Sequence, residues 1–406
     1  MSGAGAAEAL RALRRALPHP GAWALRRLLR HLHCGTLTIV LPDGRQVTRR
    51  GPAPGPDAVM HLHRWRTWAR LLVNGDMGFA EAYMDDDWSS PDLAALIELA
   101  ARNQAAIPGA DGAIWPVRML YRWAHRARDN TRANSRRNIA EHYDLGNDFY
   151  ARWLDAGMSY SSALYRDPGQ SLEDAQAAKQ DRVLELLDAQ QGHRVLEIGC
   201  GWGGLAERLA AAGCELTAVT LSQAQHGFAR ERLEQAGLAE RADIRLQDYR
   251  DIRGGYDRIV SIEMLEAVGE AWWSAWFEQL RSLLRPGGVI VFQTITIDDA
   301  RFAAYRRSAD FIQRYIFPGG MLPSPAALRA EIAAAGFAVE HLHTFGDSYA
   351  RTLRDWQRRF QAAWPEIAAS GFPARFKRMW EYYLCYCEGG FRARSVDVGL
   401  WRLARA

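Results

Sequence analysis

This 406-residue chain has few lysines, no cysteine pattern of a metal site or a disulfide framework, and no long apolar run. Lysine occurs only as Lys179 and Lys377, so arginine supplies nearly all of the positive charge. That bias is typical of a GC-rich genome and carries no chemical argument. The five cysteines, at positions 34, 200, 214, 385 and 387, have the spacing of neither metal ligands nor a disulfide framework. These absences exclude a disulfide-stapled secreted domain and favour a reducing cytoplasm.

The chain also has no run of about 18 uncharged apolar residues, and its first residues lack the apolar core of a signal peptide. We therefore expect a cytoplasmic protein without a membrane-spanning helix. The composition is 48% apolar and 24% charged, with a net charge of +4. This balance excludes disordered and fibrous classes, and the length is sufficient for two domains.

Positive charge is concentrated between residues 115 and 137, where arginines outnumber the single aspartate. The arginines are Arg118, Arg122, Arg126, Arg128, Arg132, Arg136 and Arg137, interleaved with Trp115, Met119, Tyr121 and Trp123. Such a segment predicts a surface for anionic lipid headgroups at a membrane. A solvated helix face is an equally good interpretation, and nucleic acid is disfavoured as a partner.

The distribution of turn residues predicts two domains. Residues 37–41 and 46–48 flank a Pro-Asp-Gly turn and predict a β-hairpin, with helices following around 60–74 and 91–105. Residues 1–105 are therefore expected to form a small α+β domain. Residues 106–134 predict a linker and a basic helix, and residues 135–406 predict the second domain.

The second domain alternates strand and helix patterns, which predicts an α/β fold with a mostly parallel, seven-stranded sheet. The strands that we assign are 194–198, 216–221, 243–247, 257–263, 289–296 and 338–344. Ligands of such sheets bind outside the carboxyl ends of the strands. The loops after these strands are therefore expected to surround one crevice.

Residues 195–204 (VLEIGCGWGG) are the most informative stretch, because an apolar strand runs directly into a glycine cluster. Gly199, Gly201 and Gly203 let the backbone turn sharply and approach a ligand closely. Glu197 precedes the first glycine. This pattern resembles the S-adenosylmethionine (SAM) loop of class I methyltransferases, in which the acidic residue helps hold the cationic methionine end of SAM.

Polar residues after the next two strands agree with a SAM site. Thr220, Leu221 and Gln225 follow the second strand, where nucleotide-binding enzymes hold ribose hydroxyls, and they offer neutral hydrogen-bonding groups instead of the usual acid. Asp248 and Tyr249 follow the third strand, and Asp248 is placed to accept a hydrogen bond from the adenine amino group. Each polar residue alone is more typical of a turn or a helix cap. Three strand ends in the expected order favour SAM binding.

Further motifs resemble the cyclopropane fatty acyl phospholipid synthase family over residues 135–401. They are IAEHYDLGNDFY (139–150), MSYSSA (158–163), GCGWGG (199–204), VTLS (219–222), YDRIVS (256–261), YIFPGGMLP (315–323) and CEGGFR (387–392). The resemblance implies a Rossmann-like methyltransferase domain, and it adds Tyr160 and Ser161 to the cofactor site. The implied reaction is transfer of a methyl(ene) group from SAM to a cis double bond of unsaturated phospholipid acyl chains.

The resemblance also implies where the protein works and in what assembly. A phospholipid substrate implies peripheral association with the inner face of the membrane. In bacterial relatives a similar N-terminal domain supports dimers and membrane binding, so a homodimer is a further implication.

A bound bicarbonate is the base that the resemblance implies for removing a proton from the cation left by methyl transfer. Its site, which includes no metal ion, would comprise Ser162, Glu266, Gln293, Ile295 and Tyr349. Ser162 replaces the usual cysteine of the family, and Gln293 replaces the usual histidine. Glu263 stands where many relatives have glycine.

These replacements surround the place where the cation is resolved and leave the methyl donor's site intact. We therefore expect methylation to be retained. The sequence does not decide between three products: a cyclopropane, a methylated alkene and a methyl-branched chain. It also leaves open the alternative that Glu263 itself serves as a carboxylate base. Two other hypotheses also stay open: a C-methyltransferase for small molecules, and a lipid-binding protein that has lost turnover.

Two segments are candidates for the walls of an acyl tunnel. Residues 301–316 predict one amphipathic helix, which would form a lid over the tunnel or pack on the sheet. The aromatic segment around Tyr382, Tyr383 and Tyr386 is expected in the core, and lining the tunnel is the alternative.

Overall fold

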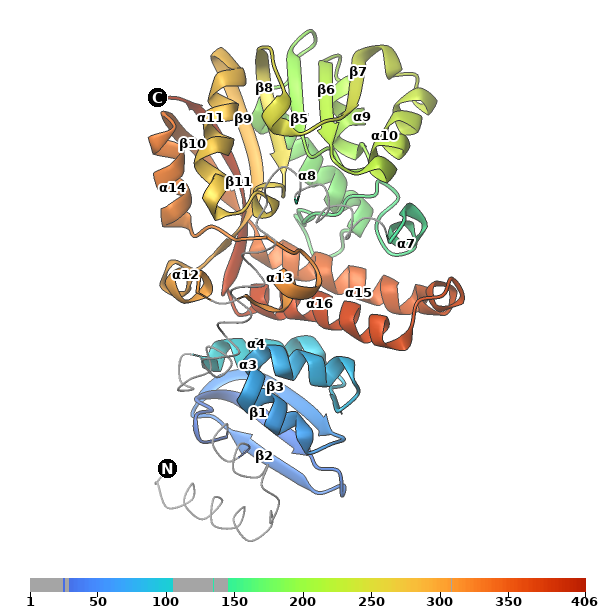
Figure 1. Ribbon diagram of the computed structural model, residues 1–406, viewed down its shortest axis with the longest axis vertical. Coiled ribbons are helices and arrows are strands. Elements are labelled where there is room, and N and C mark those ends of the chain that lie inside the picture. Colours follow the sequence, from blue (N-terminus) through green and yellow to red (C-terminus); the bar gives the residue numbers. More distant parts are fainter. Residues whose placement is uncertain (1–24, 26–28, 105–133, 135–144, 308) are drawn as a thin grey trace. The chain divides into compact units, whose positions relative to one another are not determined.

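The protein consists of two compact units (Figure 1). Its structure, a computed structural model, describes residues 25, 29–104, 134, 145–307 and 309–406. One unit contains the described residues up to 104 together with Phe372–Ala393, and the other contains residue 134, residues 145–371 and Arg394–Ala406. Nearly all of the arginine-rich segment 115–137 lies outside the described residues.

The N-terminal unit is built on a four-stranded sheet of order β2-β1-β3-β4. Its strands are β1 (Cys34–Val40), β2 (Gln46–Arg50), β3 (Ala53–Leu62) and β4 (Trp88–Ser89), and its helices are α3 (Arg66–Met84), α4 (Leu93–Asn103) and α16 (Ala374–Arg392). The antiparallel pair β1–β2 confirms the predicted hairpin. The helix expected from residue 60 begins only at Arg66. Met60 and Leu62 are buried and His61 is exposed, which is the alternation of a strand.

Helix α16 comes from the far end of the sequence. The sequence pattern assigns residues 372–393 to the second domain, whereas α16 packs against α3 and α4. Gly389 permits this close approach, because a Cβ there would lie 2.7 Å from a side-chain atom of Ile97. Tyr382 and Tyr383 are buried, as expected of core residues.

The second unit is an α/β fold with a seven-stranded sheet of order β10-β11-β9-β8-β5-β6-β7, which confirms the predicted fold class. The strands are β5 (Arg194–Ile198), β6 (Glu215–Thr220), β7 (Ala242–Leu246), β8 (Tyr256–Ile262), β9 (Leu284–Ile297), β10 (Phe337–Thr344) and β11 (Val396–Arg405). Strands β5 to β9 run parallel, and β11 is antiparallel to both β9 and β10. The sequence pattern misses β11, because it follows a helix of the other unit and so breaks the α/β alternation.

Helices and short 3₁₀ turns connect these strands. The helices are α7 (Asn147–Ala151), α8 (Leu172–Leu187), α9 (Gly204–Ala211), α10 (Gln223–Gln235), α11 (Trp273–Leu283), α12 (Asp299–Tyr305), α13 (Phe311–Tyr315), α14 (Pro325–Ala334) and α15 (Gly346–Ala369). The 3₁₀ turns are η2 (Ala239–Arg241), η3 (Tyr249–Asp251), η4 (Leu265–Ala267) and η5 (Glu270–Trp272). Serine side chains cap the N-termini of α8, α10 and α14, which explains where these helices begin.

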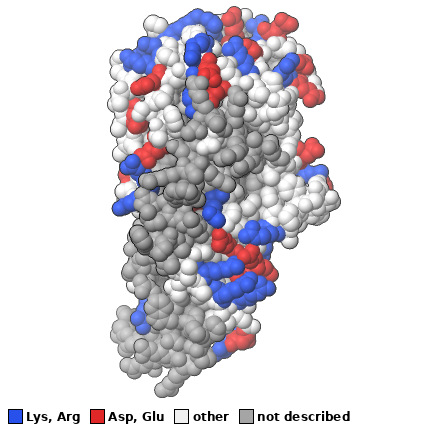
Figure 2. Space-filling model, viewed as in Figure 1, with Lys and Arg blue, Asp and Glu red and all other residues white. Residues whose placement is uncertain are grey.

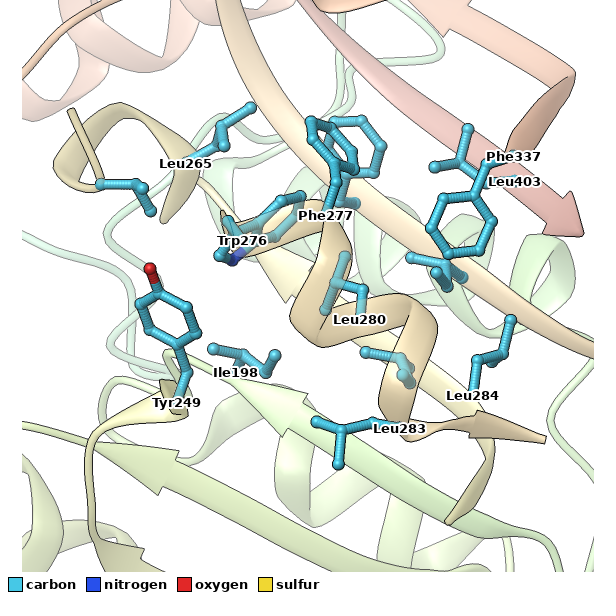
Figure 3. Close-up of a cluster of buried hydrophobic side chains, with 14 of the residues drawn as sticks. Ile198, Tyr249, Leu265, Trp276, Phe277, Leu280, Leu283, Leu284, Phe337 and Leu403 are labelled. Carbon is cyan, nitrogen blue, oxygen red and sulfur yellow. The ribbon is translucent and has the colours of Figure 1, made fainter. Parts of the chain in front are cut away.

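A hydrophobic cluster joins α11 to the sheet (Figure 3). Trp276, Phe277 and Leu280 of α11 are fully buried, and burial of each such side chain stabilises the fold by about 1.5–3 kcal/mol. Leu196 and Ile198 of β5 belong to the same cluster. Because side chains alternate along a strand, Glu197 faces the other side of the sheet. The alternation thus separates the apolar core from the candidate site.

Charged side chains of both signs lie close together on the face shown in Figure 2. Beneath the surface of the N-terminal unit, the buried Asp87 carboxylate pairs with Arg64 and Arg66. No helix within the described ranges has the length and apolarity needed to cross a membrane.

Candidate active site

The glycine-rich loop joins β5 to α9 with a left-handed backbone. Gly199, Gly201 and Gly203 have φ values of +84°, +54° and +82°, which residues with a Cβ adopt rarely. A Cβ at Gly199 would lie 3.1 Å from Met264, and one at Gly203 would lie 3.0 Å from Ala229. No atom of the described residues lies within 4 Å of a Cβ built on Gly201. Among these residues, the loop therefore leaves space for a ligand at Gly201.

Glu197 is a buried carboxylate beside this loop. It is 2% exposed, and its Oε2 atom has no hydrogen-bond partner among the described residues. Burial raises the pKa of Glu197 to about 8, and the ammonium group of Lys179 opposes the rise. A buried acceptor without a donor is unfavourable. The arrangement therefore fits a cationic ligand such as the methionine end of SAM.

The ends of β6 and β7 lie beside the glycine loop. The N–H of Gly199 donates to the carbonyl of Val219 (2.9 Å), and the N–H of Gln247 donates to that of Thr220 (3.1 Å). The Thr220 hydroxyl donates to Gln225 Oε1 at 2.9 Å, and both side chains are buried. The structure therefore brings the predicted residues of three strand ends, with Leu221 between Thr220 and α10, to one edge of the sheet.

Asp248 already has a cationic partner in the structure. Arg250 donates to Asp248 from Nε (2.9 Å) and Nη2 (2.7 Å), and the Arg250 guanidinium lies over the rings of Tyr249 and Trp272. Sequence reasoning missed this arginine. The backbone N–H of Arg250 also donates to Asp248 Oδ1 at 3.0 Å, so this arginine engages both oxygens of the carboxylate that we assign to the adenine amino group.

Residues 155–162 form a loop that α8 holds in place. Gln176 Nε2 donates to the Ser161 carbonyl at 2.8 Å, and Lys179 Nζ donates to Ser161 Oγ at 2.8 Å. The ring of Tyr160 lies 5.4 Å from that of Trp356 in α15. The loop is thus fixed between α8 and α15, and it carries the two cofactor residues that the family resemblance added.

Glu263 is the centre of a cluster of hydrogen bonds at the end of β8. Its carboxylate accepts from the backbone N–H of Ser162 (2.9 Å), from Gln293 Nε2 (2.6 Å) and from the Tyr349 hydroxyl (2.6 Å). The backbone of Glu263 is left-handed, with φ of +49°, at a cost of about 1–2 kcal/mol for a residue with a Cβ. The pKa of Glu263 is raised, because burial raises it by more than the three donors and Lys179 lower it.

Glu266, in η4, is a second buried carboxyl group with a different environment. Its Oε1 accepts from the N–H of Ile295 at 2.6 Å, and its Oε2 has no hydrogen-bond partner within the described part of the chain. Burial, followed by the charge of Glu263, raises the pKa of Glu266 to about 8. Of the pair, Glu266 therefore keeps its proton to the higher pH, because Glu263 has three hydrogen-bond donors and the charge of Glu263 acts on Glu266.

All six residues predicted for the catalytic region thus meet in one place, and a seventh accompanies them. Lys179 is 4% exposed and interacts electrostatically with Glu263, Asp155 and Glu197. Sequence reasoning missed Lys179, because a lone lysine within a helix pattern is usually solvated. Its rarity in an arginine-rich chain was the available signal.

The segment after β9 differs from the single helix predicted at 301–316. It forms α12 and α13, because the Asp310 side chain and Gln313 make a capping box that starts a new helix. Gln313 Nε2 donates to the carbonyl of Gly320, and the N–H of Met321 donates to the carbonyl of Glu266, both at 2.8 Å. The segment is therefore attached to the backbone of a catalytic candidate.

Comparisons with known proteins match most of the chain. The family model described as mycolic acid cyclopropane synthetase matches residues 130–401. Tuberculostearic acid methyltransferase UfaA1 of Mycobacterium tuberculosis is 41% identical over 394 residues, which are 94% of this chain and 90% of that protein. Cyclopropane-fatty-acyl-phospholipid synthase of Escherichia coli is 38% identical over 82% of this chain and 84% of its own length.

Solved structures agree with the fold. Cyclopropane synthase MmaA2 of Mycobacterium tuberculosis has a TM-score of 0.63 and 29% identity, and the match covers 66% of this chain and 98% of that one. Mycolic acid cyclopropane synthase CmaA1 complexed with SAH and CTAB has a TM-score of 0.61, with 29% identity over 66% of this chain and 97% of that one.

Proposed function

The chain belongs to the mycolic acid cyclopropane synthetase family and is a SAM-dependent lipid methyltransferase, and on that premise we propose that it methylates a cis double bond of unsaturated phospholipid acyl chains. We further propose that Glu263 removes the proton that ends the reaction, and that the product is a methylated alkene rather than a ring.

The contacts of Glu263 are the observation that carries this proposal. Ser162, Gln293 and Tyr349 are three of the residues that the family resemblance assigns to a bicarbonate site, and all three donate to the Glu263 carboxylate. The hydrogen bonds that these three residues would give to a bicarbonate go to Glu263 instead. The residues present therefore do not fit a separate bicarbonate, and a carboxylate of the chain itself occupies the anion's place.

The arrangement assigns a role to each group of the site. Bound SAM supplies an electrophilic methyl group, which the alkene takes with its π electrons while the C–S bond breaks toward sulfur. The acyl chain then carries a carbocation. Glu263 accepts a proton from carbon next to that centre, and the electrons of the broken C–H bond form the new double bond. Tyr349 and Gln293 orient the carboxylate, and the neutral Glu266 adds no competing charge.

Names of relatives support methylation without ring closure. UfaA1 is a methyltransferase by name, and a sphingolipid C9-methyltransferase of Gibberella zeae is 33% identical over 63% of this chain. The second candidate is cyclopropane formation. It is favoured by the Escherichia coli relative and by the contact between Glu266 and the Ile295 N–H, which keeps two residues of the implied bicarbonate site together.

Product analysis tests the proposal. Purified protein is incubated with labelled SAM and vesicles of an unsaturated phosphatidylglycerol, and the lipid products are analysed by mass spectrometry after ozonolysis. Both candidate products gain one CH₂ unit, but ozone cleaves a methylated alkene and leaves a cyclopropane intact. Labelled fragments from cleavage at the methylated carbon support the proposal, whereas a labelled chain that resists ozone contradicts it.

The Glu263→Gly variant separates the two candidate bases. Loss of the carboxylate is expected to lower turnover by about 10²-fold, with unchanged SAM affinity, because a positioned base contributes roughly that much. The three donors become free, so added bicarbonate should restore turnover and shift the product toward the ring. Glu263→Gln is the control, since its amide fills the space and leaves bicarbonate without effect. Full activity of both variants would exclude Glu263 as the base.

We also propose that the protein works at the inner face of the membrane, since its substrate chains lie in the bilayer. The arginines between residues 118 and 137 suit anionic headgroups. Co-sedimentation with anionic and with neutral vesicles tests this, and equal binding to both contradicts it. A homodimer stays a prediction from the family resemblance, to be checked by light scattering.

A further inference from the structure

Lys179 is a buried ammonium group for which the proposed reaction has no use. It lies on α8, is 4% exposed, and is one of two lysines in the chain. Burying an isolated ammonium is strongly unfavourable unless nearby acids compensate for the lost hydration. Its position therefore calls for a physical reason.

The contacts of Lys179 connect it to the loop that faces Glu263. Within the described residues, its hydrogen bond goes to Ser161 Oγ at 2.8 Å. The next residue, Ser162, donates its backbone N–H to Glu263 at 2.9 Å. Replacing Lys179 would thus affect Glu263 in two ways. It would remove the hydrogen bond that holds the Ser161–Ser162 peptide in position, and it would remove a positive charge that acts on the Glu263 carboxylate.

Acidic groups face Lys179 from several elements. Burial lowers the pKa of Lys179, and three acids oppose that lowering: Glu263 at the end of β8, Asp155 on the loop before Ser161, and Glu197 on β5. Glu266, in η4, adds a further acid that interacts with Glu263. Tyr349 of α15 donates to Glu263 and stays neutral in that role. Lys179 is the cation that acts on Glu263 among these groups.

From this arrangement we propose that Lys179 is a positioning residue with two effects. It keeps the Glu263 carboxylate ionised, and it holds the Ser161–Ser162 peptide in contact with that carboxylate. The inference rests on the proposed role of Glu263 as the proton acceptor. A carboxyl group can accept a proton only in its ionised form, and burial of Glu263 opposes that form. The positive charge of Lys179 offsets this opposition without touching the substrate.

The pH dependence of turnover tests the inference. Lys179→Met keeps the length of the side chain and removes its charge, so the acidic limb of the kcat profile should move to higher pH by about one unit or more. Turnover should fall at neutral pH and recover in alkaline buffer, while the Kd of SAM stays within about threefold. Lys179→Arg, which keeps the charge, should stay closer to the parent profile.

Lys377→Met is the matched control. Lys377 is the other lysine, lies in the N-terminal unit and pairs with Glu381 on its own helix, so this variant should leave the profile unchanged. Lys179→Gln is a second neutral variant that carries the same prediction if Lys179→Met does not fold.

Two results would overturn the inference. One is an acidic limb that does not move in the neutral variants. The other is a Kd of SAM that rises more than tenfold with an unmoved limb, which would make Lys179 a ligand of the cofactor. Glu263→Gln distinguishes these outcomes from a failure of the proposed function. Undiminished turnover in that variant would show that Glu263 is not the base, independently of the results for Lys179.

Discussion

Single residues of the site fall into two electrostatic classes. Among the described residues, neither Glu197 nor Glu266 has a donor for one of its buried oxygens, and burial raises the pKa of both to about 8. Glu263, which lies near Glu266, instead has three donors. Residue types alone do not separate these glutamates, because the difference depends on which neighbours the fold supplies.

The raised pKa of Glu197 predicts a pH-dependent affinity for SAM. Below pH 8 the empty site holds a neutral carboxyl group at this position, which must lose its proton to bind a cation. The affinity for SAM is therefore expected to rise from pH 6 to about 8 and then to level off. Calorimetry in buffers of different ionisation enthalpy should detect the released proton.

Glu197→Gln is the variant that checks this assignment. It should weaken SAM binding by at least about tenfold, as expected for loss of a charge-assisted contact, and should remove the proton release. A parent-like affinity with the same pH dependence would show that another group holds the cation.

Elements of the second unit were predictable where local patterns and packing agree. Glu197, Thr220 and Asp248 lie at or just after the ends of apolar runs. Such runs form buried parallel strands when both faces of the sheet are covered. The segment around α12 and α13 was not predictable as two helices. The amphipathic stripe of 301–316 continues across the break, and only the capping box at Asp310 shows where the second helix begins.

The capping box predicts how the segment 299–323 responds to mutation. Asp310→Ala removes the acceptor of the Gln313 N–H (2.9 Å) and should destabilise α13 by about 1 kcal/mol. Because this segment ends on the backbone of Glu266, we expect faster hydrogen exchange over 311–321 and a higher KM for lipid, with unchanged SAM affinity. Ser324→Ala, at the cap of α14, is the control and should leave exchange over 311–321 unchanged. Unaltered exchange in Asp310→Ala would show that the cap does not hold the segment.

At the scale of the whole molecule, the unfolding free energy of the ligand-free protein depends on pH through Glu197 and Glu266. The pKa values of Glu197 and Glu266 rise from 4.5 to about 8 on folding. The stabilisation from keeping each proton is complete below pH 4.5 and is lost as the pH rises through 8. Unfolding free energy of the ligand-free protein should therefore fall between pH 5 and 8, by roughly 2–5 kcal/mol for each group.

Denaturant titrations at several pH values measure this slope. The double variant Glu197→Gln, Glu266→Gln should reduce it, because neither amide titrates, while Glu263 and Asp155, whose pKa values burial also raises, retain their part of the slope. Carboxylates such as Asp85 and Asp87, whose arginine partners lower their pKa values, are already ionised at pH 5 and do not contribute there. Stability that rises from pH 5 to 8 would contradict the assignment.

The sequence by itself determined the α/β fold and the glycine loop, because these depend on local spacing and on strand order, and its resemblance to a known family indicated the residues of the catalytic region. Only the tertiary structure decided which acid keeps its proton to the higher pH, that Lys179 lies near the acids, and that α16 completes the N-terminal unit. Those properties arise from burial and from contacts between residues far apart in the chain, such as Ser162, Gln293 and Tyr349 on Glu263. Neither periodicity nor composition records such contacts.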